Sequence, residues 1–155
     1  VQQFGYLKIS SSDYLRSLTP GVEQLDLAQA RLRLQETGDE LDRQTDFRWV
    51  VDPVATPPVA TAPDASNWLF DAVRKRRQVD HFREKFGPAV MHVHLTAPDD
   101  VLRTRSDMSE TAYGIAISHS NEANARPLID IADRVFDTTL RTAHEIATQV
   151  AQAGG

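Results

Sequence analysis

Short apolar runs alternate with amphipathic stretches along this chain. Runs typical of buried strands lie at Tyr6–Ile9, Trp68–Phe70, Ala89–Leu95 and Arg134–Phe136. Apolar residues at helical spacing, with capping and helix-breaking residues at the ends, predict helices over Tyr14–Leu18, Val22–Gln44, Lys75–Phe86, Val101–Arg105, Glu122–Ile131 and Leu140–Ala153. Strands that alternate with helices are typical of an α/β fold with a parallel sheet.

A proline-rich segment interrupts this pattern. Four of the eight prolines lie between Pro53 and Pro63, so we expect residues 52–66 to form an extended, mobile connector. The pieces on either side are each too small to fold alone. We therefore expect residues 1–155 to form a single α/β domain that contains the connector.

Composition and charge narrow the class of protein. The chain has 155 residues, no cysteine and a formal net charge of −5. This excludes a disulfide framework and a thiolate metal site, and it argues against nucleic-acid binding. No apolar stretch is long enough to cross a membrane and no leader opens the chain, so we expect a cytoplasmic protein. The first residue is Val1 rather than methionine, and we expect the chain to be N-terminally incomplete.

The strand end at Asp71 is the first candidate for chemistry. Ligands of open α/β sheets bind beyond the carboxyl ends of the strands, where Asp71 and Arg74 are expected to lie. An aspartate there can hold a metal-bound water or a substrate hydroxyl, and an arginine can bind phosphate. Four cations, Arg74 to Arg77, open the following helix, where the helix dipole disfavours them unless an anion lies nearby. The alternatives are a helix cap for Asp71 and a solvated surface for the cations, which we prefer for Arg76 and Arg77.

Three weaker candidates lie elsewhere. Gln35 and Gly38 share a helix face, on which an amide beside a glycine can read a base or a hydroxyl, although by composition alone a plain surface face is the better interpretation. Arg103 and Arg105 can reach into a cleft as phosphate ligands, although solvent exposure is the better interpretation for either arginine alone. His92 and His94 point to one face of a strand, but no third metal ligand is evident, so a packed pair is the better interpretation.

The order and spacing of four stretches resemble the P-loop nucleoside-monophosphate kinase superfamily, and within it the deoxynucleoside-monophosphate-kinase-like branch. They are Phe4–Ser10, Leu34-Gln35-x-x-Gly38 continuing to Arg43 and Trp49, Phe70–Arg74 with Gln78, and Ile131–Asp137. The resemblance implies a three-layer P-loop-kinase-like parallel sheet flanked by helices. In that family strand one is central and lies between strands three and four, and the first stretch corresponds to strand two.

The resemblance also implies roles for residues. Asp71 would be catalytic, either orienting the acceptor or assisting Mg²⁺ through a bound water, with no direct metal ligand expected. Arg74, Arg103 and Arg105 would bind phosphates, and ATP and Mg²⁺ would be the cofactors. The acceptor would be bound by Gln35, Gly38 and Arg43.

One departure from the family is severe. Its nucleotide-binding motif is G-x-x-x-x-G-K-[ST], and none of the seven glycines here is followed by Lys-Ser or Lys-Thr. The P-loop strand and loop would therefore lie before Val1. A fainter resemblance, carried by Leu41–Thr45, Phe47–Trp49, Asn121-Glu122 and Ala132-Asp133, is to a kinase-like domain that precedes an adenylosuccinate-synthetase-like domain in some bacterial proteins.

Together these observations lead to two expected functions. The first is a nucleotide-binding domain that transfers the γ-phosphoryl group of ATP to a nucleotide or similar small acceptor. The second is a non-catalytic module, derived from such a kinase, that senses a nucleotide or docks a partner. A small-molecule nucleotide is the expected ligand, and a homodimer or a longer fused polypeptide is the expected assembly.

Overall fold

The computed structural model describes residues 2–62, 67–71, 73–106, 109–118 and 120–154. The fold is mixed α/β and mostly helical. Its elements are, in chain order, η1 (Gln2–Phe4), β1 (Tyr6–Ser10), α1 (Ser11–Ser17), η2 (Val22–Gln24), α2 (Leu27–Thr45), η3 (Arg48–Val50), η4 (Val51–Ala55), α3 (Thr56–Thr61), β2 (Asn67–Asp71), α4 (Arg76–Phe86), η5 (Gly87–Ala89), β3 (Val93–Thr96), α5 (Asp99–Arg105), α6 (Glu110–Ser118), α7 (Ser120–Ala125), η6 (Arg126–Ile131), β4 (Arg134–Asp137) and α8 (Ala143–Gly154).

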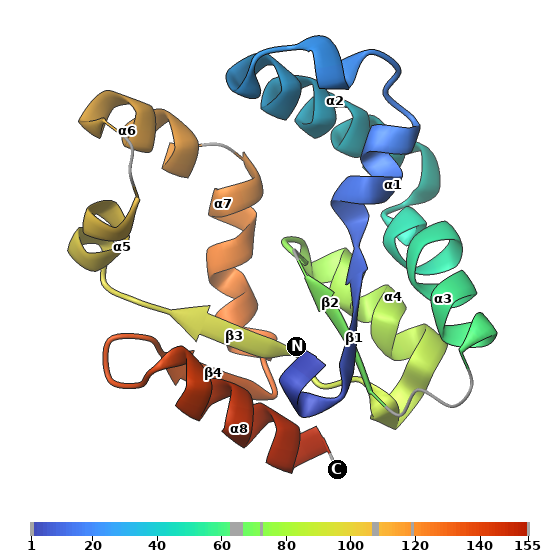
Figure 1. Cartoon of the computed structure of the whole chain (residues 1–155), viewed down its shortest axis with the longest axis vertical. Coiled ribbons are helices and arrows are strands. Elements are labelled where there is room, and N and C mark those ends of the chain that lie inside the picture. Colours follow the sequence, from blue (N-terminus) through green and yellow to red (C-terminus); the bar gives the residue numbers. More distant parts are fainter. Residues whose placement is uncertain (1, 63–66, 72, 107–108, 119, 155) are drawn as a thin grey trace.

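The four expected strands all form, but they do not join into one sheet. β1 pairs in parallel with β2, placing Ile9 opposite Phe70, and β3 pairs in parallel with β4, placing Leu95 opposite Phe136. Figure 1 shows the pairs in separate halves of the molecule, one blue to green and the other yellow to red. The described residues thus form two two-stranded parallel sheets, and the expected three-layer sheet is not seen, because no described strand joins the two pairs.

The main hydrophobic core lies in the N-terminal half. Ile9 of β1 and Phe82 of α4 enclose it together with the buried residues of η3 and η4, and Phe70 of β2 packs against them. The rings of Phe70 and Phe82 are 4.8 Å apart between centroids. This packing fixes α4 against one face of the β1–β2 sheet and so determines where the first turn of α4 lies.

The proline-rich segment is the clearest correction to the expected structure. Residues 52–61, predicted as part of an extended connector, lie in the π-helical turn η4 and the helix α3, and residues 63–66 lie outside the described part. Val51, Val54 and Ala55 are buried in the core. Burial of this apolar side of the segment favours the helix, and Pro57 and Pro58 lie in the first turn of α3, where the missing N–H costs little.

The long helix predicted from Val22 is divided in two. Asp26 accepts a hydrogen bond from the backbone N–H of Gln29 at 2.9 Å and caps a new helix, α2. Gly38 then lies inside α2 without breaking it. No helix among the described residues is long and apolar enough to span a bilayer.

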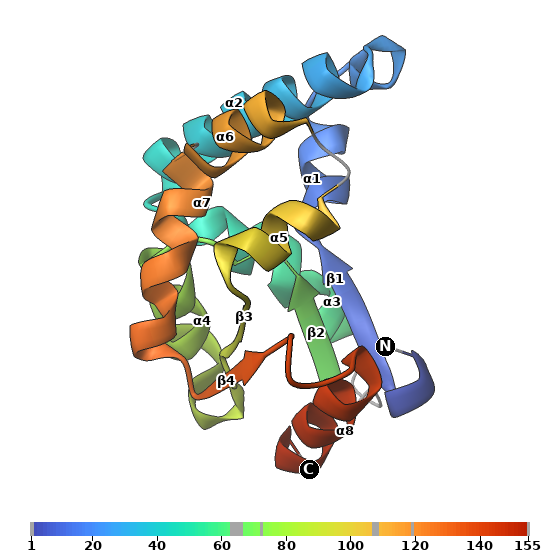
Figure 2. The ribbon, with the colours of Figure 1, turned by 90° about the vertical axis from the view of Figure 1, so that its left-hand side faces the viewer.

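The last helix returns to the beginning of the chain. The ring of His144 in α8 lies 5.7 Å, between centroids, from the ring of Phe4 in η1. Figure 2 shows α8 beside β4 and near the N-terminus. A smaller group of buried apolar residues, Leu128, Phe136 and Ile146, belongs to this C-terminal half.

Candidate functional site

Asp71 ends β2, as expected, but its carboxylate already has a partner. Lys8 Nζ of the neighbouring strand donates to Asp71 Oδ2 at 2.9 Å, and both side chains are about half exposed or more. The hydrogen bond to Asp71 raises the pKa of Lys8 above its usual value. Among the described residues no group of three His, Cys, Asp or Glu side chains could hold a metal ion. In this arrangement the Asp71 carboxylate is paired with a lysine and belongs to no cluster of potential metal ligands among the described residues.

The turn between β2 and α4 is fixed by a glutamine. The backbone N–H of Arg74 donates to Oε1 of Gln78 at 3.1 Å, and Gln78 is buried. This contact folds the chain back on itself just before α4, and Arg74 is half-buried there. The turn therefore presents the cations that follow Arg74 at the first turn of α4.

Lys75 joins this turn to α2. Its ammonium donates to Oδ2 of Asp42 at 2.5 Å and to Oδ1 of Asp39 at 3.1 Å, and it lies 5.5 Å from the centroid of the Phe47 ring. Burial would lower the pKa of Lys75, but the hydrogen bonds to Asp42 and Asp39 raise it above its usual value. Asp42 also accepts from the indole N–H of Trp49 at 2.7 Å. The side chain of Lys75 is thus a fixed charge between α2 and α4.

The chain reverses after α2 through two left-handed residues. Asp46 has φ 49° and Phe47 has φ 65°, a conformation that costs a residue with a side chain about 1–2 kcal/mol. Arg77 donates to the Asp46 carboxylate at 2.9 and 2.6 Å, and this hydrogen bond lowers the pKa of Asp46 below its usual value. His81, fully buried in α4, contacts the Asp46 carbonyl oxygen through Nε2 at 2.6 Å. These contacts from α4 hold the strained turn in place.

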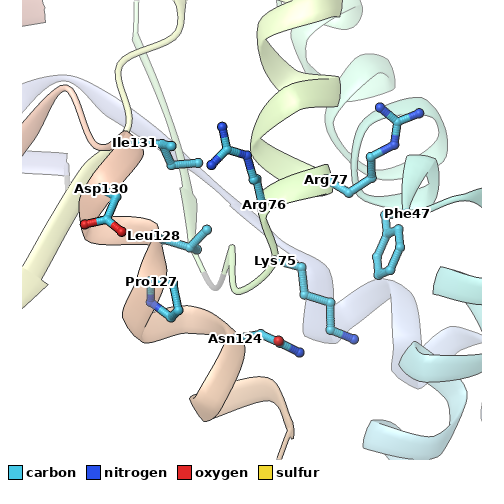
Figure 3. A pocket seen from close by; sticks show the side chains of 9 residues that line it. All are labelled: Phe47, Lys75, Arg76, Arg77, Asn124, Pro127, Leu128, Asp130 and Ile131. Atoms are coloured by element: carbon cyan, nitrogen blue, oxygen red, sulfur yellow. The ribbon is translucent and has the colours of Figure 1, made fainter.

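A cavity of about 340 Å³ opens between this turn and η6. Its lining residues are Phe47, Lys75, Arg76, Arg77, Asn124, Pro127, Leu128, Asp130 and Ile131. Figure 3 shows Phe47 and Arg77 on one side and Leu128 and Ile131 on the other, with Lys75 and Arg76 between them. The side chain of Arg76 is exposed and forms no hydrogen bond or ion pair with another described residue. The cavity therefore combines an uncommitted guanidinium with an aromatic ring and an apolar wall.

The seven residues selected from the sequence do not meet at this cavity. None of them lines it, although Arg74 immediately precedes Lys75. Gly38 faces α1, where an added Cβ would lie 3.7 Å from Leu15. Arg43 bonds to Glu40 and to the carbonyl oxygen of Asp39 within α2. Gln35 is half-buried on the same helix.

The two arginines expected to bind phosphate from α5 have protein partners. Arg103 donates to Glu110 at 3.2 Å, and Arg105 donates to the hydroxyl and the carbonyl oxygen of Thr138 at 2.8 and 3.0 Å. Both lie in the C-terminal half of the chain. The contacts of Arg105 attach the end of α5 to the turn that follows β4.

Several residues of the cavity were missed or set aside from the sequence. Arg76 and Arg77 were interpreted as a solvated surface, and Lys75 and Phe47 received no role. The sequence signal for this site was the run of cations at the start of a helix. Cations are unfavourable at that end of a helix unless anions lie nearby. Asp39, Asp42 and Asp46 supply those anions for Lys75 and Arg77, whereas Arg76 has none among the described residues.

Comparison with known proteins gives no assignment. No protein-family model, no curated protein and no solved structure matches this chain. A functional proposal must therefore stand on the cavity and its charges, together with the family resemblance of the four sequence stretches.

Proposed function

We propose that this chain is a kinase-like domain that binds the phosphates of a nucleotide at the first turn of α4. The observation that carries the proposal is the uncommitted guanidinium of Arg76 at the cavity. Guanidinium groups bind phosphate through two parallel N–H groups. A side chain that is left unpaired beside two fully paired cations is the one available to an anionic ligand.

The backbone of α4 adds to the attraction for an anion. The first N–H groups of a helix have no acceptor within the helix, and no side chain caps α4. The helix dipole places partial positive charge at the same end. α4 has eleven residues and begins at Arg76. The N–H groups of its first turn and the Arg76 side chain would therefore bind the phosphates together.

The pairing of the strands supports the kinase-like part of the proposal. In the family that the sequence resembles, strand one lies between strands three and four. β1 and β2 would be strands two and three, and β3 and β4 the next two strands. The parallel pairs β1–β2 and β3–β4, with no described strand between them, agree with that order.

The family resemblance adds an activity, phosphoryl transfer, to the proposed phosphate binding. The γ-phosphoryl group of ATP would pass to a nucleotide or similar acceptor, and the protein would contribute mainly positioning and charge stabilisation. On the resemblance alone, Asp71 is the proposed catalytic residue, Arg74, Arg103 and Arg105 are further phosphate ligands, and the acceptor side is formed by Gln35, Gly38 and Arg43. Arg103 and Arg105 would have to leave Glu110 and Thr138 to reach a phosphate. The Asp71 carboxylate is paired with Lys8, so a magnesium ion would have to compete with this ammonium for it.

Nucleotide binding without catalysis is the second candidate. One observation favours it: the Asp71 carboxylate is paired with Lys8. Such a module would sense a nucleotide or dock a partner. An assay of ATP-dependent phosphoryl transfer separates the two candidates, because Asp71→Asn abolishes transfer in the first, while the second shows binding with no turnover.

The binding proposal is tested by calorimetry with ADP and pyrophosphate. Replacing Arg76 by alanine should weaken both ligands about tenfold, because a hydrogen bond to a charged group contributes about 1.5–3 kcal/mol. Arg31→Ala is the matched control, since Arg31 is an exposed arginine of α2 that does not line the cavity. The proposal fails if the wild-type chain binds neither ligand, or if the two variants lose affinity equally.

A further inference from the structure

Phe47 is held in an unfavourable conformation at the edge of the cavity. Its φ of 65° is rare for a residue with a bulky side chain, and it follows Asp46, which is also left-handed. Strained residues persist only where the surrounding structure fixes them, and they cluster at ligand-binding sites. The strained conformation of Phe47 therefore indicates a function that depends on the position of its ring.

The contacts around the turn fix the position of this ring. The backbone N–H of Phe47 donates to the carbonyl oxygen of Asp42 at 3.0 Å. His81 and Arg77 hold Asp46 from α4, as described above. The ring itself is half-buried and lines the cavity, with the Lys75 ammonium 5.5 Å from its centroid.

The other walls of the cavity show what kind of ligand fits beside Phe47. Pro127, Leu128 and Ile131 form an apolar surface from η6, Asp130 of the same element adds a carboxylate, and Asn124 adds an amide. Figure 3 shows Leu128 and Ile131 across the cavity from Phe47, and Arg76 between them and α4. Inorganic phosphate or pyrophosphate would use the guanidinium and leave the aromatic and apolar walls in contact with water. An anion that carries a flat aromatic body would cover both.

We infer that Phe47 is a specificity-determining residue that contacts the planar base of a nucleotide whose phosphates lie at Arg76. This inference rests on the proposed function. It names the base as the part of the ligand by which the site selects nucleotides. Stacking of a base on an aromatic side chain is sequence-tolerant, because every base has a π-face. Phe47 therefore distinguishes nucleotides from phosphates that lack a base, rather than one base from another.

The experiment compares ADP with pyrophosphate in three chains, the wild type and the variants Phe47→Gly and Phe47→Tyr. Glycine removes the ring and adopts the left-handed φ without strain, so the turn is retained. Tyrosine keeps the ring. Calorimetry gives the affinities, and far-UV circular dichroism confirms that each variant is folded.

The expected result is a selective loss. The wild type binds ADP more tightly than pyrophosphate, Phe47→Gly weakens ADP about tenfold and changes pyrophosphate less than twofold, and Phe47→Tyr keeps the affinity for ADP. A tenfold loss lies within the range measured when stacking aromatics are removed.

Other results overturn the inference and are distinguishable from one another. Unchanged ADP affinity in Phe47→Gly rejects contact between Phe47 and the base, while binding of both ligands by the wild type leaves the proposed function intact. Equal weakening of ADP and pyrophosphate shows that Phe47 acts by holding Lys75, which also rejects base contact. Binding of neither ligand by the wild type rejects the inference together with the proposed function.

Discussion

Asp42 is the buried carboxylate that connects α2 with its neighbours. One oxygen accepts from the Trp49 indole and the other from the Lys75 ammonium, and the residue is only 5% exposed. Both oxygens thus face donors. An asparagine at this position would turn its NH₂ group toward one of them and remove the charge that compensates Lys75.

Asp42→Asn should therefore cost about 3–5 kcal/mol of unfolding free energy, the range for breaking one side of a buried ion pair. The matched control is Asp39→Asn, because Asp39 binds the same ammonium but its side chain is 41% exposed, and its loss should cost less than about 1 kcal/mol. Urea denaturation followed by tryptophan fluorescence measures both. Equal costs for the two variants would contradict the central role of Asp42.

Some residues of the site could be foreseen and others could not. Asp71 and Arg74 follow a short apolar run, so their place at the end of β2 was evident from local sequence. The partnership of Lys75 with Asp42 spans 33 residues and exists only because α2 packs beside the start of α4. The left-handed φ of Phe47 has no local signature either, because glycine or asparagine is the usual residue there.

At the scale of elements, the local sequence pattern predicted the structure correctly where burial and intrinsic propensity favour the same element. The strand at Tyr6–Ile9 and the helix at Lys75–Phe86 are confirmed to within one or two residues at each end. The segment 52–61 was predicted wrongly as an extended connector because of its prolines, although two of them lie in the first turn of α3. What decided the structure was burial of Val51 and Val54 against residues distant in the sequence.

Stability measurements can test whether this segment is a packed element. Val54→Ala should lower the unfolding free energy by about 2 kcal/mol, since two buried methyl groups are lost and a cavity is left. Asp52→Ala is the control in the same turn, and its exposed side chain should change the free energy by less than about 0.5 kcal/mol. Urea denaturation of the two variants gives the comparison. A mobile connector would show no difference between them.

At the scale of the whole molecule, Arg83 attaches α4 to the C-terminal half. It donates to the carbonyl oxygen of Ile131 at 2.8 Å and to both oxygens of Asp133 at 3.1 Å. Asp133 also accepts from the backbone N–H of His92 at 2.7 Å, just before β3. One carboxylate thus joins α4, the start of β3 and the residue before β4. Since no described strand connects the two sheets, this contact links the β3–β4 half to α4, which packs against the core beneath β1 and β2.

The link should make stability depend on pH at the acid end. The hydrogen bond from His92, opposed by burial and reinforced by Arg83, lowers the pKa of Asp133 below its usual value. The unfolded chain therefore takes up the proton first as the pH falls, so the contribution of Asp133 is present above about pH 4 and disappears as the pH falls through its folded pKa. Asp133→Asn should be less stable than the wild type at pH 7 by no more than about 1 kcal/mol, because the side chain is 41% exposed, and the gap should narrow as the pH falls through the folded pKa of Asp133. The control is Asp100→Asn, because the exposed Asp100 carboxylate forms no hydrogen bond or ion pair with a described residue. Urea denaturation across this pH range measures the gap, and a gap that stays constant with pH would show that Asp133 acts through its shape rather than its charge.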